Sequence, residues 1–110
     1  MFDFFEGGFA IMEELFMKLI ETIDNNTWMR GIDTYNFCEV NRDGLKRQYS
    51  TTMSMIIIDN DTVMFIDSDD DITKFFLLSS VKDIIFNADE KDGYKILFVN
   101  GSYMIFAPLS

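Results

Sequence analysis

The sequence predicts an α+β fold. One N-terminal amphipathic helix packs on a curved antiparallel β-meander of about six or seven strands, and a partly closed barrel is one form that this sheet can take. Apolar residues recur at helical spacing near the N-terminus, short alternating segments follow Asn26, and the connections between those segments are short. Short connections favour antiparallel neighbours. We expect one domain over residues 1–110, with a helical segment at 1–25 and an antiparallel sheet at 32–108.

The predicted helix rests on an apolar stripe. Its members are separated by alternating steps of three and four residues, and they are Phe9, Met12, Phe16, Leu19 and Ile23. Such spacing is typical of a helix that buries one face. We expect Gly7-Gly8 to break the chain before the helix and Asn25-Asn26 to break it afterwards. Three phenylalanines lie outside the stripe and are expected to fold back on the core or to seal a dimer: Phe2, Phe4 and Phe5.

The strands are predicted from short apolar or alternating segments bounded by turn residues. These segments are 33–40, 45–58, 63–66, 74–78, 81–87, 94–99 and 102–107, and the long segment 45–58 is expected to bend or to contain a bulge. The clearest hairpin joins the last two segments through Asn100-Gly101. Asn-Gly between apolar strands favours a type I′ turn, in which both central residues have positive φ.

Composition narrows the function classes. The formal net charge is −10 and the sequence pI is near 4.1, which disfavours nucleic acid and anionic lipid and favours a basic partner. The only cysteine is Cys38 and histidine is absent, so an internal disulfide and every His-based site are excluded.

Acidic residues at the N-terminus argue against a signal peptide or a membrane span. We expect a cytoplasmic protein, and codon usage inferred from abundant Ile, Asn and Phe suggests an AT-rich bacterial or phage genome.

The most distinctive stretch of the chain is acidic and contains neither Lys nor Arg. It contributes six candidate partner-binding residues, to which two helix residues add, and the full set is Asp59, Asp61, Asp67, Asp69, Asp70, Asp71, Glu13 and Glu14. In an extended chain, carboxylates two residues apart lie roughly 6.6 Å apart on one face. Such a row imitates a line of phosphates and fits a Lys/Arg groove that evolved for nucleic acid. The alternative interpretation is a solvated loop, because Asp is a common turn former.

Metal binding and catalysis are not predicted. Asp67, Asp69 and Asp71 match the opening of a calcium loop, but Ile72 stands where that loop needs Gly and Leu78 where it needs Glu. The serines at turn positions lack a nucleophile elbow, no Gly-rich phosphate loop is present, and Cys38 lies in an alternating strand typical of the core. We therefore expect no cofactor, no metal and no catalytic residue.

Two smaller features have competing interpretations. Trp28 is expected to anchor the junction between helix and sheet in the core, although Trp is also common at interface hot spots. Arg42, Lys46 and Arg47 form a local basic patch, which is weak support for nucleic-acid or lipid binding against the overall negative charge. The alternative is that this patch pairs with the acidic face of a second copy, so a homodimer is one expectation. The segment 77–85 resembles the strand-turn-strand passage of PH-like and GRAM-like domains, but those domains carry their helix after the strands.

Two functional hypotheses follow. The first is a non-enzymatic, acidic protein-binding protein, such as a phage-type anti-defence inhibitor that blocks the basic nucleic-acid-binding surface of a nuclease. The alternative is a small structural or adaptor module, self-associating or a PH-like barrel, without an inhibitory role. Its contacts would be hydrophobic, through the N-terminal phenylalanines or the methionines, and would persist at high salt.

Overall fold

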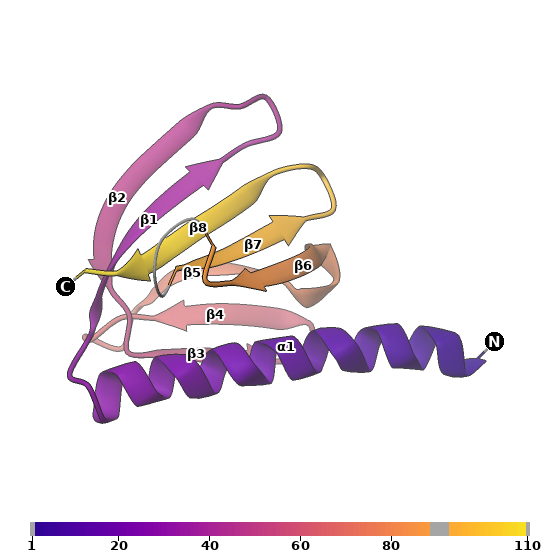
Figure 1. Cartoon of the computed structure of the whole chain (residues 1–110), viewed down its shortest axis with the longest axis horizontal. Coiled ribbons are helices and arrows are strands. Elements are labelled where there is room, and N and C mark those ends of the chain that lie inside the picture. Colours follow the sequence, from indigo (N-terminus) through magenta and orange to yellow (C-terminus); the bar gives the residue numbers. More distant parts are fainter. Residues whose placement is uncertain (1, 89–92, 110) are drawn as a thin grey trace.

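The structure is a computed structural model that describes the backbone of residues 2–88 and 93–109 and the side chains of residues 12–88 and 93–109. One long helix, α1 (Phe2–Trp28), precedes all of the described strands (Figure 1). The strands in chain order are β1 (Thr34–Val40), β2 (Lys46–Thr52), β3 (Met55–Asp59), β4 (Thr62–Ile66), β5 (Ile72–Leu77), β6 (Val81–Phe86), β7 (Tyr94–Phe98) and β8 (Tyr103–Pro108), with a 3-10 turn, η1 (Leu78–Ser80), between β5 and β6.

The described strands form two antiparallel sheets. The large sheet has the order β2-β1-β8-β7-β6, and the small sheet has the order β3-β4-β5. The predicted α+β class, with the helix first and the strands antiparallel, is confirmed. The structure adds that the strands number eight among the described residues and that neither sheet closes into a barrel.

The long segment 45–58 is where the chain passes from one sheet to the other. Met53 donates its backbone N–H to Asp33 at 2.7 Å, beside β1, whereas Ser54 donates to Ile66 at 2.8 Å, at the end of β4. The side chain of Met53 is fully buried at this crossing. The predicted bend is therefore a change of sheet, and it makes two strands, β2 and β3, out of one segment.

Helix α1 covers the opening between the two sheets. It packs against β3, an edge of the small sheet, and against β6, an edge of the large sheet, and Figure 1 shows it running along that side of the molecule. The stripe residues Phe16, Leu19 and Ile23 are fully buried there, and each contributes about 1.5–3 kcal/mol of hydrophobic stabilisation.

The core between the sheets is aromatic. Phe37 of β1, Phe65 of β4 and Phe106 of β8 have ring centroids 5.3–6.2 Å apart, a range that favours offset and edge-to-face contacts. Phe76 of β5 extends this cluster to the helix, because its ring centroid lies 6.2 Å from that of Phe16. The aromatic residues therefore hold the two sheets and the helix together.

The predicted breaks on either side of the helix are not observed, whereas the predicted helical segment 1–25 lies close to the observed helix. The helix passes through Gly7-Gly8 and continues beyond Asn25-Asn26 to Trp28, because a glycine in a helix interior costs about 1 kcal/mol but does not forbid the helix. Asn26 stays helical because its buried side chain has tertiary partners. Its Nδ2 donates to the Tyr35 hydroxyl at 3.0 Å, and its Oδ1 accepts from Arg30 at 3.1 Å.

Three hairpins share one loop geometry, and it differs from the predicted type I′ turn. In the loop 98–102, Gly101 has a positive φ of 92° and Asn100 does not, Gly101 donates to the Phe98 carbonyl at 3.1 Å, and Phe98 donates to the Ser102 carbonyl at 2.9 Å. This is a three-residue loop with its last residue in the left-handed region. The same backbone bonds recur in the loops 41–45 and 67–71.

Candidate protein-binding surface

The predicted acidic stretch is divided by strand β4. Asp59 and Asp61 lie at one end of this strand, and Asp67, Asp69, Asp70 and Asp71 follow its other end. The five residues of β4 span roughly 17 Å. The aspartates therefore form two groups at opposite ends of the small sheet, and the group at 67–71 is a tight hairpin loop instead of an extended row.

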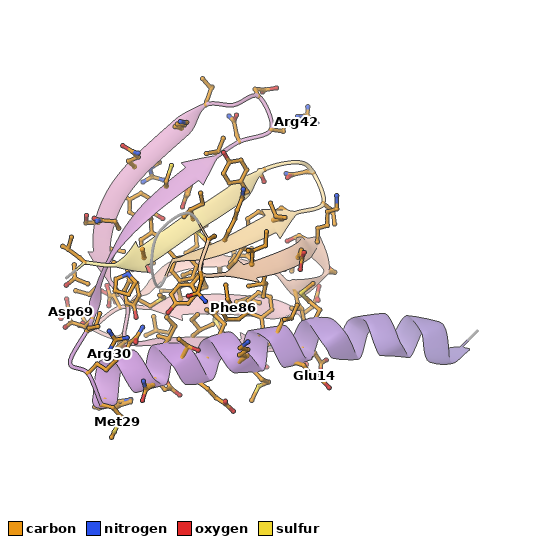
Figure 2. All side chains as sticks on the ribbon, viewed as in Figure 1. Glu14, Met29, Arg30, Arg42, Asp69 and Phe86 are labelled. Carbon is orange, nitrogen blue, oxygen red and sulfur yellow. The ribbon has the colours of Figure 1, made fainter. Side chains whose placement is uncertain are left out.

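The two glutamates of the predicted set lie apart from the loop 67–71. Figure 2 shows Asp69 at the end of the molecule where Met29 and Arg30 follow the helix, whereas Glu14 lies well along α1 toward its N-terminus. Glu13 and Glu14 are exposed on a helix face that they share with Lys18, whose ammonium lies 4.7 Å from the centre of the Phe86 ring. The structure thus does not bring these glutamates together with the loop 67–71.

The loop at 67–71, called the acidic loop below, is organised by one of its own carboxylates. Asp67 Oδ1 accepts hydrogen bonds from the backbone N–H groups of Asp69 and Asp71, each at 2.9 Å. Asp70 has a positive φ of 65°, in the position that glycine holds in the two similar loops. Asp67 therefore has a structural role and Asp70 stands at a position that favours glycine, while the side chains of Asp69, Asp70 and Asp71 are exposed.

Asp61 also has a structural role. Its Oδ2 accepts from the hydroxyl of Ser79 at 2.7 Å, its Oδ1 accepts from the Ser79 backbone N–H at 3.1 Å, and its carbonyl accepts from Leu78 at 2.7 Å. These bonds hold the turn η1 against the hairpin between β3 and β4. Asp59 ends β3 with an exposed side chain.

The small sheet has an apolar surface that sequence reasoning did not identify. Ile57, Met64 and Phe75 are register partners across its three strands, so they lie on one face. We call this surface the outer face, and by register its apolar members are Met55, Ile57, Met64, Ile66, Ile72, Phe75 and Leu77. Ile72 is placed there by its pairing with Ile66, beyond the irregularity in register. Phe75 is 70% exposed, Ile72 54%, Leu77 53% and Ile57 40%. An exposed apolar surface of this kind usually marks an interaction site.

The opposite face of the small sheet belongs to the core. Ile56, Val63 and Phe65 are members of the buried cluster, and Phe76 packs against it. Ile66 is 7% exposed and lies outside that cluster, so the outer face is covered at this position. The sequence carried a sign of this arrangement, because both alternating sets of residues in 55–58 and 75–78 are apolar, which is typical of a sheet covered on both faces.

A polar network joins the large sheet to strand β5 of the small sheet. Glu39 of β1 accepts a hydrogen bond from the Tyr49 hydroxyl, and it pairs with the Lys74 ammonium at 2.9 Å and with the guanidinium of Arg47 at 3.9 Å. Burial acts to raise the pKa of Glu39, but the bonds from Tyr49 and Lys74 and the charges of Lys74 and Arg47 outweigh it and lower that pKa. The pKa of Tyr49 is raised, mainly by burial and to a smaller extent by the hydrogen bond to the Glu39 carboxylate and its charge.

The network is suited to holding the two sheets together. At neutral pH the Glu39 carboxylate stays ionised and the Tyr49 phenol stays protonated. A second tyrosine, Tyr35, is fully buried, and burial raises its pKa to about 12 although the bond from Asn26 opposes this change. Among the described residues, no group of three His, Cys, Asp or Glu side chains is placed to hold a metal ion.

Two expectations about single residues were wrong. Trp28 was expected in the core, but its side chain is 72% exposed at the end of the helix, next to Met29 at 79%. Cys38 was expected to be buried and is instead a free, partly exposed thiol, because it points away from the core face that Phe37 and Tyr35 occupy. The basic residues Arg42 and Lys46 are exposed around the hairpin between β1 and β2.

Comparisons of the chain with family models, curated proteins and solved structures find no match. The segment 77–85, which resembles PH-like and GRAM-like domains, joins the last residue of β5 to β6 and so connects strands of different sheets. No helix in the described part of the chain is both long enough and apolar enough to cross a membrane.

Proposed function

We propose that this protein is a non-enzymatic binding protein whose partner is a basic surface of another protein. One observation carries the proposal: the small sheet exposes the apolar outer face, and this face is bounded by carboxylates at both ends. Asp59 lies at one end, and Asp69, Asp70 and Asp71 lie at the other. Apolar contacts supply affinity, while the acidic ends select a partner with Lys or Arg around an apolar centre.

The more specific form of the proposal is an inhibitor that acts in the cytoplasm. A net charge of −10 steers the chain toward positively charged grooves and accelerates the encounter. Binding over such a groove excludes nucleic acid by occupying its site. In this form the protein is a phage-type anti-defence protein, and its partner is a nuclease or another nucleic-acid-binding protein.

The test is a pull-down from a low-GC bacterial lysate with tagged protein, washed at low and at high salt. The first variant replaces Asp69, Asp70 and Asp71 with Asn, which removes three charges and leaves the Asp67 hydrogen bonds in place. The matched control removes three exposed charges elsewhere through Glu21→Gln, Asp43→Asn and Asp83→Asn. We expect a basic nucleic-acid-binding protein to be retained at low salt, to be lost at high salt, and to be retained by the control but not by the first variant.

Inhibition is then measured directly on the retained protein. The expected result is that the chain displaces labelled DNA or RNA from its partner, and that the Asp69–Asp71 variant needs a much higher concentration to do so. Equal retention by the wild type and the first variant at low salt would remove the acidic loop from the binding surface.

The second candidate is an adaptor or self-associating module, and the exposure of Phe75 and Leu77 favours it. Purely apolar contacts persist at high salt because screening acts mainly on exposed charges. A partner retained at both salt concentrations, or a dimer observed by sedimentation that dissociates when Phe75 is changed to Thr, would support this candidate over the inhibitor.

A further inference from the structure

Strand β5 is the open edge of the small sheet. Among the described strands it pairs with β4 alone, whereas the other edge strand, β3, packs against α1. Every second residue of an edge strand directs its backbone N–H and C=O groups away from the sheet. Such an edge is a template on which a further strand can pair.

A groove of about 300 Å³ runs along this edge. Its walls are Lys74, Phe75 and Phe76 of β5 on one side and residues of the hairpin between β7 and β8 on the other, together with Ser80. Consecutive residues of a strand point to opposite faces. A groove lined by three consecutive residues therefore follows the backbone edge and not one face. An added strand lies about 4.8 Å from its neighbour, which places it in this groove.

Two devices that often block an edge, a lysine on the strand and irregular pairing, do not block this one. Lysine on an edge strand discourages pairing, but the Lys74 ammonium is directed to Glu39 at 2.9 Å, under the large sheet. The irregularity in pairing lies between Phe65 and Ile66, opposite the first residues of β5. The four residues from Lys74 to Leu77 keep regular register with β4, so they offer a straight edge. At its end the Leu77 carbonyl already accepts a hydrogen bond from the Ser80 hydroxyl at 2.6 Å.

We propose that β5 binds an extended segment of the partner by strand addition, and this inference rests on the function proposed above. The chemistry of the segment follows from the charges at both ends of the edge. Asp71 directly precedes β5, and the Asp61 carboxylate accepts hydrogen bonds from the backbone N–H and the hydroxyl of Ser79, just after β5. A segment with a short apolar or β-branched centre and Lys or Arg at both ends complements this edge.

Strand β5 of a second copy does not fit the same edge. Pairing of β5 with β5 in antiparallel orientation places the acidic loop of one copy beside Asp61 of the other, and in parallel orientation it places the two acidic loops together. Both arrangements set carboxylates against carboxylates in chains that each carry a net charge of −10, which costs free energy. This excludes β5 of a second copy, and the occupant that we propose on the charges of the edge is a basic segment of another protein.

The test uses the full chain and a labelled synthetic peptide, KKVTVTVKK, with binding measured by fluorescence anisotropy. Two further peptides carry backbone N-methyl groups on one or on the other alternating set of central residues. Strand addition uses only the N–H groups on one side of the peptide. We expect one methylated peptide to bind at least about tenfold more weakly and the other to bind as the parent does.

Amide hydrogen exchange supplies the second readout. We expect alternate amides of Lys74–Leu77 to become protected when KKVTVTVKK binds, and amides of β2 to remain unchanged. Absence of binding at millimolar peptide, equal effects of the two methylated peptides, or unchanged exchange in β5 would each overturn strand addition.

A third peptide and the charge variant separate this inference from the proposed function. EEVTVTVEE is expected not to bind, and the Asp69, Asp70 and Asp71 to Asn variant is expected to bind KKVTVTVKK several-fold more weakly at low salt. If KKVTVTVKK and EEVTVTVEE protect the β5 amides equally, strand addition is supported and the preference for a basic partner is refuted. If KKVTVTVKK binds in a charge-dependent way without protecting β5, the basic partner stands and strand addition fails.

Discussion

The side chains of Asp67 and Asn41 have the same structural role in two different hairpins. Each side-chain oxygen accepts hydrogen bonds from the backbone N–H groups two and four residues ahead, at 2.9–3.0 Å. The acidic residue at position 67 is therefore not required for the shape of its loop, because an amide oxygen performs the same function at position 41. This equivalence separates the structural role of the acidic loop from its charge.

We predict that Asp67→Asn leaves the free energy of unfolding within about 0.5 kcal/mol of the wild type. Asp67→Ala removes the acceptor of two backbone N–H groups and is expected to lower the free energy of unfolding by about 1–2 kcal/mol. Urea unfolding monitored by circular dichroism measures both values. Equal destabilisation by the two substitutions would show that the charge itself stabilises the loop.

Asp70 is expected to be less stable in its position than glycine. Its φ of 65° lies where Gly44 and Gly101 stand in the equivalent loops, at 87° and 92°, and the left-handed region costs an L-residue about 1–2 kcal/mol. Asp70→Gly should raise the free energy of unfolding by about 0.5–1 kcal/mol. Asp69→Gly is the control, since Asp69 has no positive φ, and it should not raise the free energy of unfolding. A destabilised Asp70→Gly protein would contradict the assignment of strain.

The Glu39 network should make stability depend on pH. Because the folded-state pKa of Glu39 is lowered, its contribution is present above the unfolded value of about 4.3 and is lost as pH falls through the folded pKa. Glu39→Gln is therefore expected to cost about 1–2 kcal/mol at pH 7, with the difference from wild type closing in acid. Urea unfolding across pH measures this difference.

The control for that experiment is Arg47→Gln. The Arg47 side chain is 76% exposed and lies 3.9 Å from the carboxylate, so the substitution should change the free energy of unfolding by less than about 0.5 kcal/mol. A Glu39→Gln difference that stays constant from pH 7 to pH 3 would mean that the ionised form of Glu39 contributes nothing.

Phe75 and Phe76 offer a matched pair on the two faces of β5. Phe76 has ring centroids at 5.1 Å from Phe98 and 5.8 Å from Phe65, so Phe76→Thr should lower the free energy of unfolding by about 3 kcal/mol. Phe75→Thr should change it by less than about 0.5 kcal/mol and should reduce the binding of a hydrophobic dye. Comparable destabilisation by both substitutions would mean that the outer face is packed and is not a binding surface.

Local patterns predicted the elements of this fold well. Phe16, Leu19 and Ile23 of the stripe are fully buried, and the predicted strand segments match the observed strands within a few residues. The division of 45–58 was less visible, because an apolar run does not show where a chain leaves one sheet for another. Pairing of β1 with β8 was also not predictable, since it depends on contacts between distant residues and not on neighbours in the chain.

The candidate surface was predicted only in part. The aspartates were identified by composition, but their separation by β4 and the hydrogen bonds of Asp61 and Asp67 depend on the folded backbone. The outer face was missed because apolar residues are assigned to the core by default, and only register shows that Phe75 and Phe76 face opposite ways. Trp28 was misplaced for the same reason.

The pairing of β1 with β8 also governs when the protein can fold. Phe37 and Phe106 are register partners with ring centroids 5.3 Å apart, so the centre of the large sheet joins the first strand to the last. During synthesis, β1 and β2 lack their neighbour in the large sheet until Phe106 has left the ribosome, and a two-stranded hairpin is marginally stable in water. Long-range pairing of this kind slows folding, and the nascent chain exposes Tyr35 and Phe37 to chaperones and proteases throughout that interval.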